Sequence, residues 1–151
     1  MKQSGLKKAE KLFRARRYGD VISHLEPQIF LYRDNPRFYY LLGMACLRTN
    51  DAGGAYSYLA RTLHLDRDNI EARLGLAVAH LRRRETQDAR QTWLAVLDLQ
   101  PNNVQAKRGL DLVRNAESDS DIVEALDKGA TRRLLPGAGI HAPPVAYVTP
   151  P

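Results

Sequence analysis

The sequence predicts an all-α protein built as a solenoid of three helical hairpins, and three observations lead to this prediction. Apolar residues recur at helical spacing through most of the chain. The chain matches itself at an offset of 34 residues, which aligns RFYYLLGMACLRTN with ARLGLAVAHLRRRE. A short turn interrupts the pattern in the middle of each unit, so each unit is a pair of helices. Such pairs contact only their neighbours and bury a continuous core by stacking.

The repeat divides residues 2–116 into three units and a cap. The units are 2–35, 36–69 and 70–103, and residues 104–116 are expected to form the capping helix. Turns are expected around residues 17–19, 50–54 and 84–86. Each unit ends on an asparagine whose side chain can accept an orphan backbone N–H of the next helix. These asparagines are Asn35, Asn69 and Asn103, and the first is followed by Pro36.

Small residues are expected to set the spacing between paired helices. Gly43 and Ala77 in the first helices should face Ala55 and Ala89 in the second helices, which would let the helix axes approach closely. The core between the helices is expected to be filled by larger side chains. These are Leu42, Leu59, Leu63, Leu76, Trp93, Leu97 and Leu110.

The repeat pattern ends near Ser118. Residues 117–128 could form one further short helix. Residues 129–151 contain five of the eight prolines and no acidic residue, so we expect an irregular, proline-rich tail. The tail also carries the apolar residues Leu134, Leu135, Ile140, Val145 and Tyr147. We therefore expect it to dock on its own solenoid, on a neighbouring chain or on a partner.

The 34-residue period and its columns resemble the tetratricopeptide repeat family. In the second unit the family columns hold Tyr39, Leu42, Gly43, Cys46, Ala55 and Leu59, and in the third Arg73, Leu76, Ala77, His80, Ala89, Trp93 and Pro101. The chain departs from the family pattern where arginine or lysine replaces the closing proline or the large aromatic residue. These departures are Arg33, Arg67, Arg73 and Lys107. The resemblance implies a right-handed stack whose first helices line a concave groove that binds peptides.

Projecting the first helices onto that groove predicts a partner-binding site with an apolar floor and a row of arginines. The floor comprises Leu6, Phe13, Tyr40, Met44, Leu47, Leu74, Val78, Leu81 and Leu112. Arg14, Arg48 and Arg82 recur at the 34-residue period, with Arg37 and Arg108 nearby. The predicted partner is a protein segment that is apolar with acidic flanks. In the alternative interpretation, the apolar residues pack between hairpins and the arginines stay solvated near the negative ends of their helices.

The resemblance also predicts what the groove does not bind. Tetratricopeptide domains that hold the C-terminal carboxylate of chaperones use Lys, Asn and Arg at set groove positions. The matching positions here are Leu6, Glu10, Leu41, Glu71 and Gly75. The clamp is therefore expected to be absent. Similarity to the three-repeat chaperones of bacterial type III secretion remains an alternative.

No catalytic, metal or cofactor site is expected. The four histidines, His24, His64, His80 and His141, lie at no metal-ligand spacing from one another, from Cys46 or from a carboxylate. Cys46 falls in an inward column, where a small apolar role is expected rather than a nucleophile. No glycine-rich phosphate loop follows a strand, because no strand is evident. We therefore expect an adaptor, scaffold or chaperone-like protein rather than an enzyme.

The net charge of +6 leaves alternative partners open. A basic surface could bind nucleic acid through Arg14, Arg16, Arg17, Arg82, Arg83, Arg84, Arg132 and Arg133. We regard this as the lesser alternative, since no recognition helix or stacking platform is evident. Self-assembly through the tail is a third possibility. The sequence has neither a membrane span nor an apolar N-terminal signal, which favours a cytoplasmic location.

Overall fold

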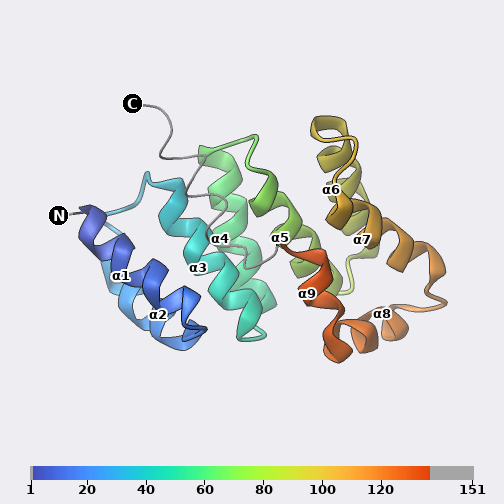
Figure 1. The fold of residues 1–151 in the computed structure, drawn as a ribbon, viewed down its shortest axis with the longest axis horizontal. Coiled ribbons are helices and arrows are strands. Elements are labelled where there is room, and N and C mark those ends of the chain that lie inside the picture. The colour runs from blue at the N-terminus through green and yellow to red at the C-terminus, as the bar shows by residue number, and fades with distance from the viewer. Residues whose placement is uncertain (1, 137–151) are drawn as a thin grey trace.

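The computed structural model describes residues 2–136, with side chains from residue 6 onward. Three helical hairpins follow one another along the chain (Figure 1). They are α1 (Lys2–Arg14) with α2 (Tyr18–Leu25), α3 (Pro36–Arg48) with α4 (Ala52–Leu65), and α5 (Ile70–Arg82) with α6 (Thr86–Leu99). The elements beyond them are α7 (Val104–Asn115), α8 (Asp119–Ala125), the π-turn η2 (Leu126–Ala130) and α9 (Thr131–Leu134). The described part of the chain contains no strand.

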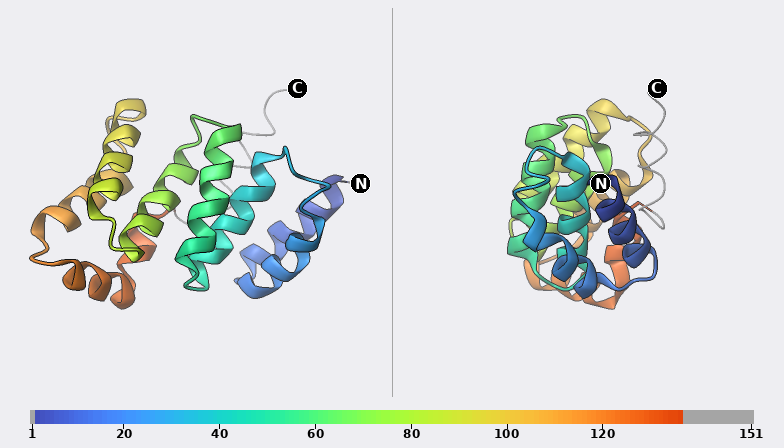
Figure 2. Two further views of the ribbon diagram at one scale, coloured as in Figure 1. Left: turned by 180° about the vertical axis from the view of Figure 1, so that it is seen from behind. Right: turned by 90° about the vertical axis from the view of Figure 1, so that its left-hand side faces the viewer.

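The hairpins stack in single file. Each first helix packs against its own second helix, and α4 packs in turn against α5 of the next hairpin. The first helices α1, α3 and α5 lie side by side, and the view along the stack in Figure 2 shows the hairpins one behind another. The predicted all-α solenoid is confirmed. We call the side formed by α1, α3, α5 and α7 the first-helix face.

Repeated asparagines begin the first helices. The side-chain oxygens of Asn35, Asn69 and Asn103 accept hydrogen bonds from backbone N–H groups three residues further on, at 3.2, 2.9 and 2.8 Å. Each bond satisfies a donor that has no partner inside its helix. All three predicted N-caps are confirmed.

Repeated left-handed residues close the hairpin turns. Arg16, Asn50 and Arg84 have φ angles of 62°, 63° and 61°, and each lies 34 residues from the next. Positive φ is uncommon for residues other than glycine. The same turn is therefore built three times. The predicted turns include Asn50 and Arg84, but their left-handed conformation was not predicted, because two of the three residues are arginines.

Glycines bring successive elements into close contact. A Cβ atom on Gly43 would lie 2.6 Å from Cγ of Leu59, so the small column works as predicted but packs on Leu59. A second column had not been foreseen. A Cβ atom on Gly75 would lie 2.8 Å from Sδ of Met44, and one on Gly109 would lie 2.2 Å from the Trp93 ring. These two glycines, 34 residues apart, let α5 and α7 pack closely against the hairpin that precedes each of them.

The first hairpin departs from the regular unit. Helix α2 has only eight residues and passes into a 3₁₀ turn, η1 (Glu26–Gln28), at Pro27. The chain then runs irregularly to α3, leaving Phe30 82% exposed. Tyr32 is buried in this stretch, and its ring stacks on Phe38 at 5.1 Å between centroids. Pro27 lacks the N–H that a longer second helix would need.

The chain folds back on itself after α7. The short helix expected within residues 117–128 is present as α8. The expectation of an irregular segment from residue 129 is wrong over residues 131–134, which form α9. Leu134 and Leu135 are buried, and α9 packs against α5 and α7, so this part of the tail docks on its own solenoid. Ile140, Val145 and Tyr147 lie outside the described residues.

Candidate protein-interaction surface

The predicted apolar floor lies on the first helices, but its side chains are buried. Tyr40, Met44 and Leu47 on α3 are 1%, 2% and 6% exposed. Phe13 on α1 and the three floor residues of α5 are buried as well. The α5 residues are Leu74, Val78 and Leu81. The expectation of an exposed apolar stripe is therefore wrong for these seven residues, while Leu112 on α7 stays partly exposed.

Packing between hairpins accounts for the burial seen at α3. Gly75 presents no side chain to its neighbours, and Met44 Sδ and Leu47 Cδ1 lie 2.8 and 3.5 Å from the place its Cβ would occupy. The two α3 side chains thus extend into the space that glycine leaves open on α5. They contribute to core stability in the way the alternative interpretation predicted.

The α5 and α7 end of the first-helix face carries the returning C-terminal segment. Helices α8 and α9 pack against α5, and α9 also packs against α7, as Figure 1 shows for the red end of the ribbon. A hollow of about 240 Å³ remains between α7 and α9, lined in part by Arg108, Leu112 and Leu134. Two predicted site residues, Arg108 and Leu112, therefore meet the chain's own segment there.

The predicted row of arginines is present, and its members differ in environment. Arg14 is exposed, while Arg48 is half-buried with its guanidinium 5.7 Å from the centre of the Tyr18 ring. Nη1 of Arg82 lies 2.5 Å from Oδ1 of Asp127. Arg108 is exposed and donates to the Arg133 carbonyl at 3.3 Å. The row therefore offers cations at its ends and one already paired with a carboxylate.

The tetratricopeptide repeat family matches residues 47–113, from the end of α3 to the last turn of α7. The period, the paired helices and the single-file stacking agree with that match. Residues 47–113 of this chain thus resemble tetratricopeptide repeats in sequence as well as in fold.

Solved tetratricopeptide domains share the fold. The first such domain of human RPAP3, determined by NMR, superposes with a TM-score of 0.69 at 20% identity, covering 85% of this chain and 97% of that one. The first such domain of Spaghetti (RPAP3), bound to the HSP90 peptide SRMEEVD, superposes with a TM-score of 0.68 at 22% identity, covering 83% and 92%. A comparison with curated protein sequences gave no match. None of the described helices combines the length and the hydropathy of a membrane span.

One position of the tetratricopeptide carboxylate clamp is occupied here by an acidic residue in an ion pair. Oε2 of Glu10 on α1 lies 2.9 Å from Nε of Arg37 on α3, and the guanidinium of Arg37 lies 5.3 Å from the centre of the Tyr40 ring. The pair is largely buried and joins α1 to α3. Arg37, predicted beside the arginine row, thus has a structural contact within the helical stack.

Cys46 occupies an inward position of the second hairpin. Burial, followed by the nearby carboxylates of Asp51 and Glu26, raises the pKa of its thiol to about 12. The thiol therefore stays protonated near neutral pH, and only the thiolate is a nucleophile. This environment agrees with the expected small apolar role.

The turn of the third tetratricopeptide hairpin gathers three possible metal ligands that sequence analysis missed. Nδ1 of His80 lies 2.8 Å from Oε1 of Glu85, and Asp88 brings the ligand atoms within 4.8 Å of one another. These residues share no helix face, so their spacing gave no signal. The second carboxylate oxygen of Glu85 lies 3.3 Å from Nη2 of Arg83, so a cation already stands beside this cluster.

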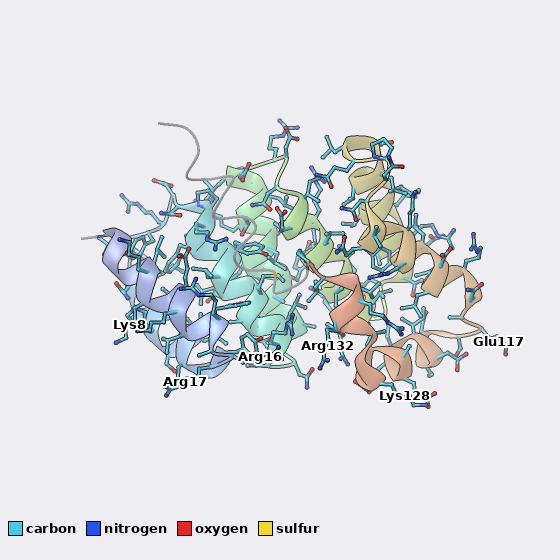
Figure 3. The ribbon with its side chains drawn as sticks, in the orientation of Figure 1. Lys8, Arg16, Arg17, Glu117, Lys128 and Arg132 are labelled. Carbon is cyan, nitrogen blue, oxygen red and sulfur yellow. The ribbon has the colours of Figure 1, made fainter. Side chains whose placement is uncertain are left out.

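Basic side chains collect along one edge of the molecule. Figure 3 shows Lys8 on α1, Arg16 and Arg17 at the turn between α1 and α2, and Lys128 and Arg132 near α9, with the acidic Glu117 further along. Arg17 pairs with Asp20 at 2.7 Å, which lowers the charge available there.

Proposed function

We propose that this chain is a protein-interaction module that binds a segment of a partner protein along the first-helix face. The partner segment is apolar with acidic flanks, and the chain acts as an adaptor, scaffold or chaperone-like component without catalysis of its own. The apolar part of the segment supplies affinity, because burying one leucine-sized side chain is worth roughly 1.5–3 kcal/mol. The arginines select acidic flanks and fix their position.

The observation that carries this proposal is the occupant that the face already holds. The chain's own α8 to α9 segment lies on α5 and α7 with buried leucines, and its Asp127 pairs with Arg82. This occupant has the composition predicted for the partner: apolar side chains against the helices and a carboxylate on the arginine row. Arg14 and Arg108 are exposed cations near the two ends of the same face.

The test selects peptides from a random library on the full-length chain and compares two charge-reversal variants. Arg14→Glu with Arg108→Glu changes the first-helix face, and Arg67→Glu with Arg90→Glu makes the same charge change at exposed positions elsewhere. We expect selected peptides to carry apolar residues with acidic flanks and to bind the first variant at least tenfold more weakly than the control. Equal binding to both variants would contradict the proposed surface. Tyr40 and Leu47 are unsuitable for this test, because they are buried.

The SRMEEVD peptide separates this chain from the clamp type of tetratricopeptide domain. Glu10 and Glu71 stand at clamp positions, and carboxylates there repel a C-terminal carboxylate. We expect the peptide to bind this chain no better than its C-terminally amidated form. Binding that depends on the free carboxylate would show that other residues supply a clamp.

Nucleic acid is the second candidate partner, on the basis of the basic edge. A fluorescence anisotropy titration with a random oligonucleotide at two salt concentrations tests it. Phosphate contacts would give an affinity that falls steeply with salt. We expect weak binding, since Arg17, Arg82 and Arg83 already lie against carboxylates.

A further inference from the structure

We propose that the segment of residues 119–135 is a built-in competitor that closes the α5 and α7 part of the first-helix face until a partner helix replaces it. This inference rests on the proposed function, and it adds how access to the face is controlled. It also specifies the replacing ligand as a short amphipathic helix with an acidic residue for Arg82.

The segment is held by apolar contacts at both of its ends. Ile122 is buried near its start, Leu126 near its middle, and Leu134 and Leu135 at its end. Helix α8 packs against α5, and α9 packs against both α5 and α7. The segment therefore covers a surface that a partner lying along the first helices would need.

The segment's own helices are too short to persist without the solenoid. Helix α8 has seven residues and α9 has four, and Gly129, at φ 109°, interrupts the π-turn between them. Isolated helices of this length are unstable in water, because nucleation costs more than a few hydrogen bonds return. Release from α5 and α7 would consequently unfold the segment, which makes docking an order–disorder step of the kind that partners exploit.

The polar contacts of the segment are ones that a partner can reproduce. The carboxylate of Asp127 that meets Arg82 is 62% exposed, and Thr86 Oγ1 donates to Oδ1 of Asp119 at 2.7 Å. Both contacts belong to the outer edge of the interface. An incoming acidic side chain can take the place of Asp127 without leaving Arg82 unpaired.

The fit between the segment and α7 is incomplete. The hollow of about 240 Å³ between α7 and α9 is lined by Leu112, Leu134 and Asn115 among others, and Arg108 stands beside it. A partner helix with a larger apolar side chain at this point would fill space that the segment leaves open. The chain's own segment has the advantage of being covalently attached. Better packing at the hollow is what would let a partner helix replace it.

The experiment opens the segment in the full-length chain and offers the face a defined probe. Leu134→Asp with Leu135→Asp buries two charges on docking, which expels α9. The probe is a fluorescein-labelled peptide of residues 119–136. We expect the opened chain to bind it at least tenfold more tightly than the unchanged chain. The matched control, Leu94→Asp with Leu99→Asp, alters exposed leucines of α6 and should bind the probe as weakly as the unchanged chain.

Two further measurements keep the result decisive. A probe carrying Asp127→Lys should bind the opened chain several-fold more weakly, because it faces Arg82 with a like charge. If the opened variant unfolds, as judged by circular dichroism, the full-length Asp127→Lys variant replaces it, with a smaller gain in probe binding expected. Equal probe binding by the opened and unchanged chains overturns the inference.

The peptides selected on the full-length chain separate failure of the gate from failure of the proposed function. Peptides that bind the opened and unchanged chains equally, but lose affinity with Arg14→Glu and Arg108→Glu, leave the interaction surface standing and overturn the gate. Selected peptides whose affinity changes with none of these variants overturn both the gate and the interaction surface. Selected peptides that bind the opened chain more tightly support both.

Discussion

The repeat body, α1 to α7, and the C-terminal segment, α8 to α9, are attached to the molecule in different ways. In the body each helix of the three hairpins packs against its own partner and against a neighbouring hairpin or α7, and glycines make room for Met44 and Trp93 where these units meet. The segment has helices of seven and four residues. It packs on the solenoid against α5 and α7, and its Asp119 also accepts a hydrogen bond from Thr86 of α6. Apolar burial alone does not distinguish the two regions, since both bury leucines.

The two regions differ in how far the elements around each residue are themselves supported by other helices. A body residue is held between elements that are themselves held, so removing it weakens the whole stack. A segment residue lies on a short helix that no hairpin partner supports, so its loss should open the segment and leave the stack folded. Variants at equivalent positions in the two regions therefore test this difference.

Replacing Trp93 by alanine should have the largest effect. The ring is fully buried, and it fills the joint between α6 and α7 against Gly109. Removing a buried tryptophan costs about 3–5 kcal/mol of unfolding free energy. Because Trp93 is the only tryptophan, urea unfolding is followed by circular dichroism. A loss confined to α7 and the segment, with α3 to α5 unchanged, would contradict the view of the body as one unit.

Gly109→Ala should come next, with Gly19→Ala as its control. Replacing a glycine inside a helix by alanine normally raises the unfolding free energy by about 0.5–1 kcal/mol. At Gly109 the new Cβ atom would lie 2.2 Å from the Trp93 ring, and overpacking of this kind costs about 1–3 kcal/mol. At Gly19 nothing lies within 4 Å. The melting temperature should therefore fall for Gly109→Ala and stay unchanged or rise for Gly19→Ala.

The sequence alone was sufficient for the fold, because repetition supplies many independent signals for one answer. The period, the asparagine caps and the turn positions agree, and all three were predicted. The site was harder to predict. Met44 and Leu47 look surplus to a single hairpin, but their side chains extend to Gly75 in the next one. The docking of Leu134 and Leu135 depends on a reversal of the chain direction, which no local sequence pattern predicts.

Removing one helix cap in each region gives a direct test of the comparison. Asn69 caps α5 at 2.9 Å, and Ser118 caps α8 at 3.2 Å. Substitution of either by alanine removes one capping bond, typically worth about 1 kcal/mol. Asn69→Ala should lower the global unfolding free energy by roughly that amount. Ser118→Ala should leave it unchanged and speed hydrogen exchange only in α8. A global loss from Ser118→Ala would show that the segment unfolds together with the body.

The pair of Arg82 and Asp127 should have the smallest effect, although it marks the boundary between the two regions. Asp127 is well exposed, so water screens the attraction, and such pairs contribute about 0.2–1 kcal/mol. A double-mutant cycle with Arg82→Gln and Asp127→Asn isolates this coupling, read as hydrogen exchange of α9 amides at low and high salt. We expect a small coupling that salt weakens further and no change in α3 amides. A coupling above this range that persisted in high salt would mean that the pair is a fixed part of the body, since a partner's carboxylate could not readily displace it.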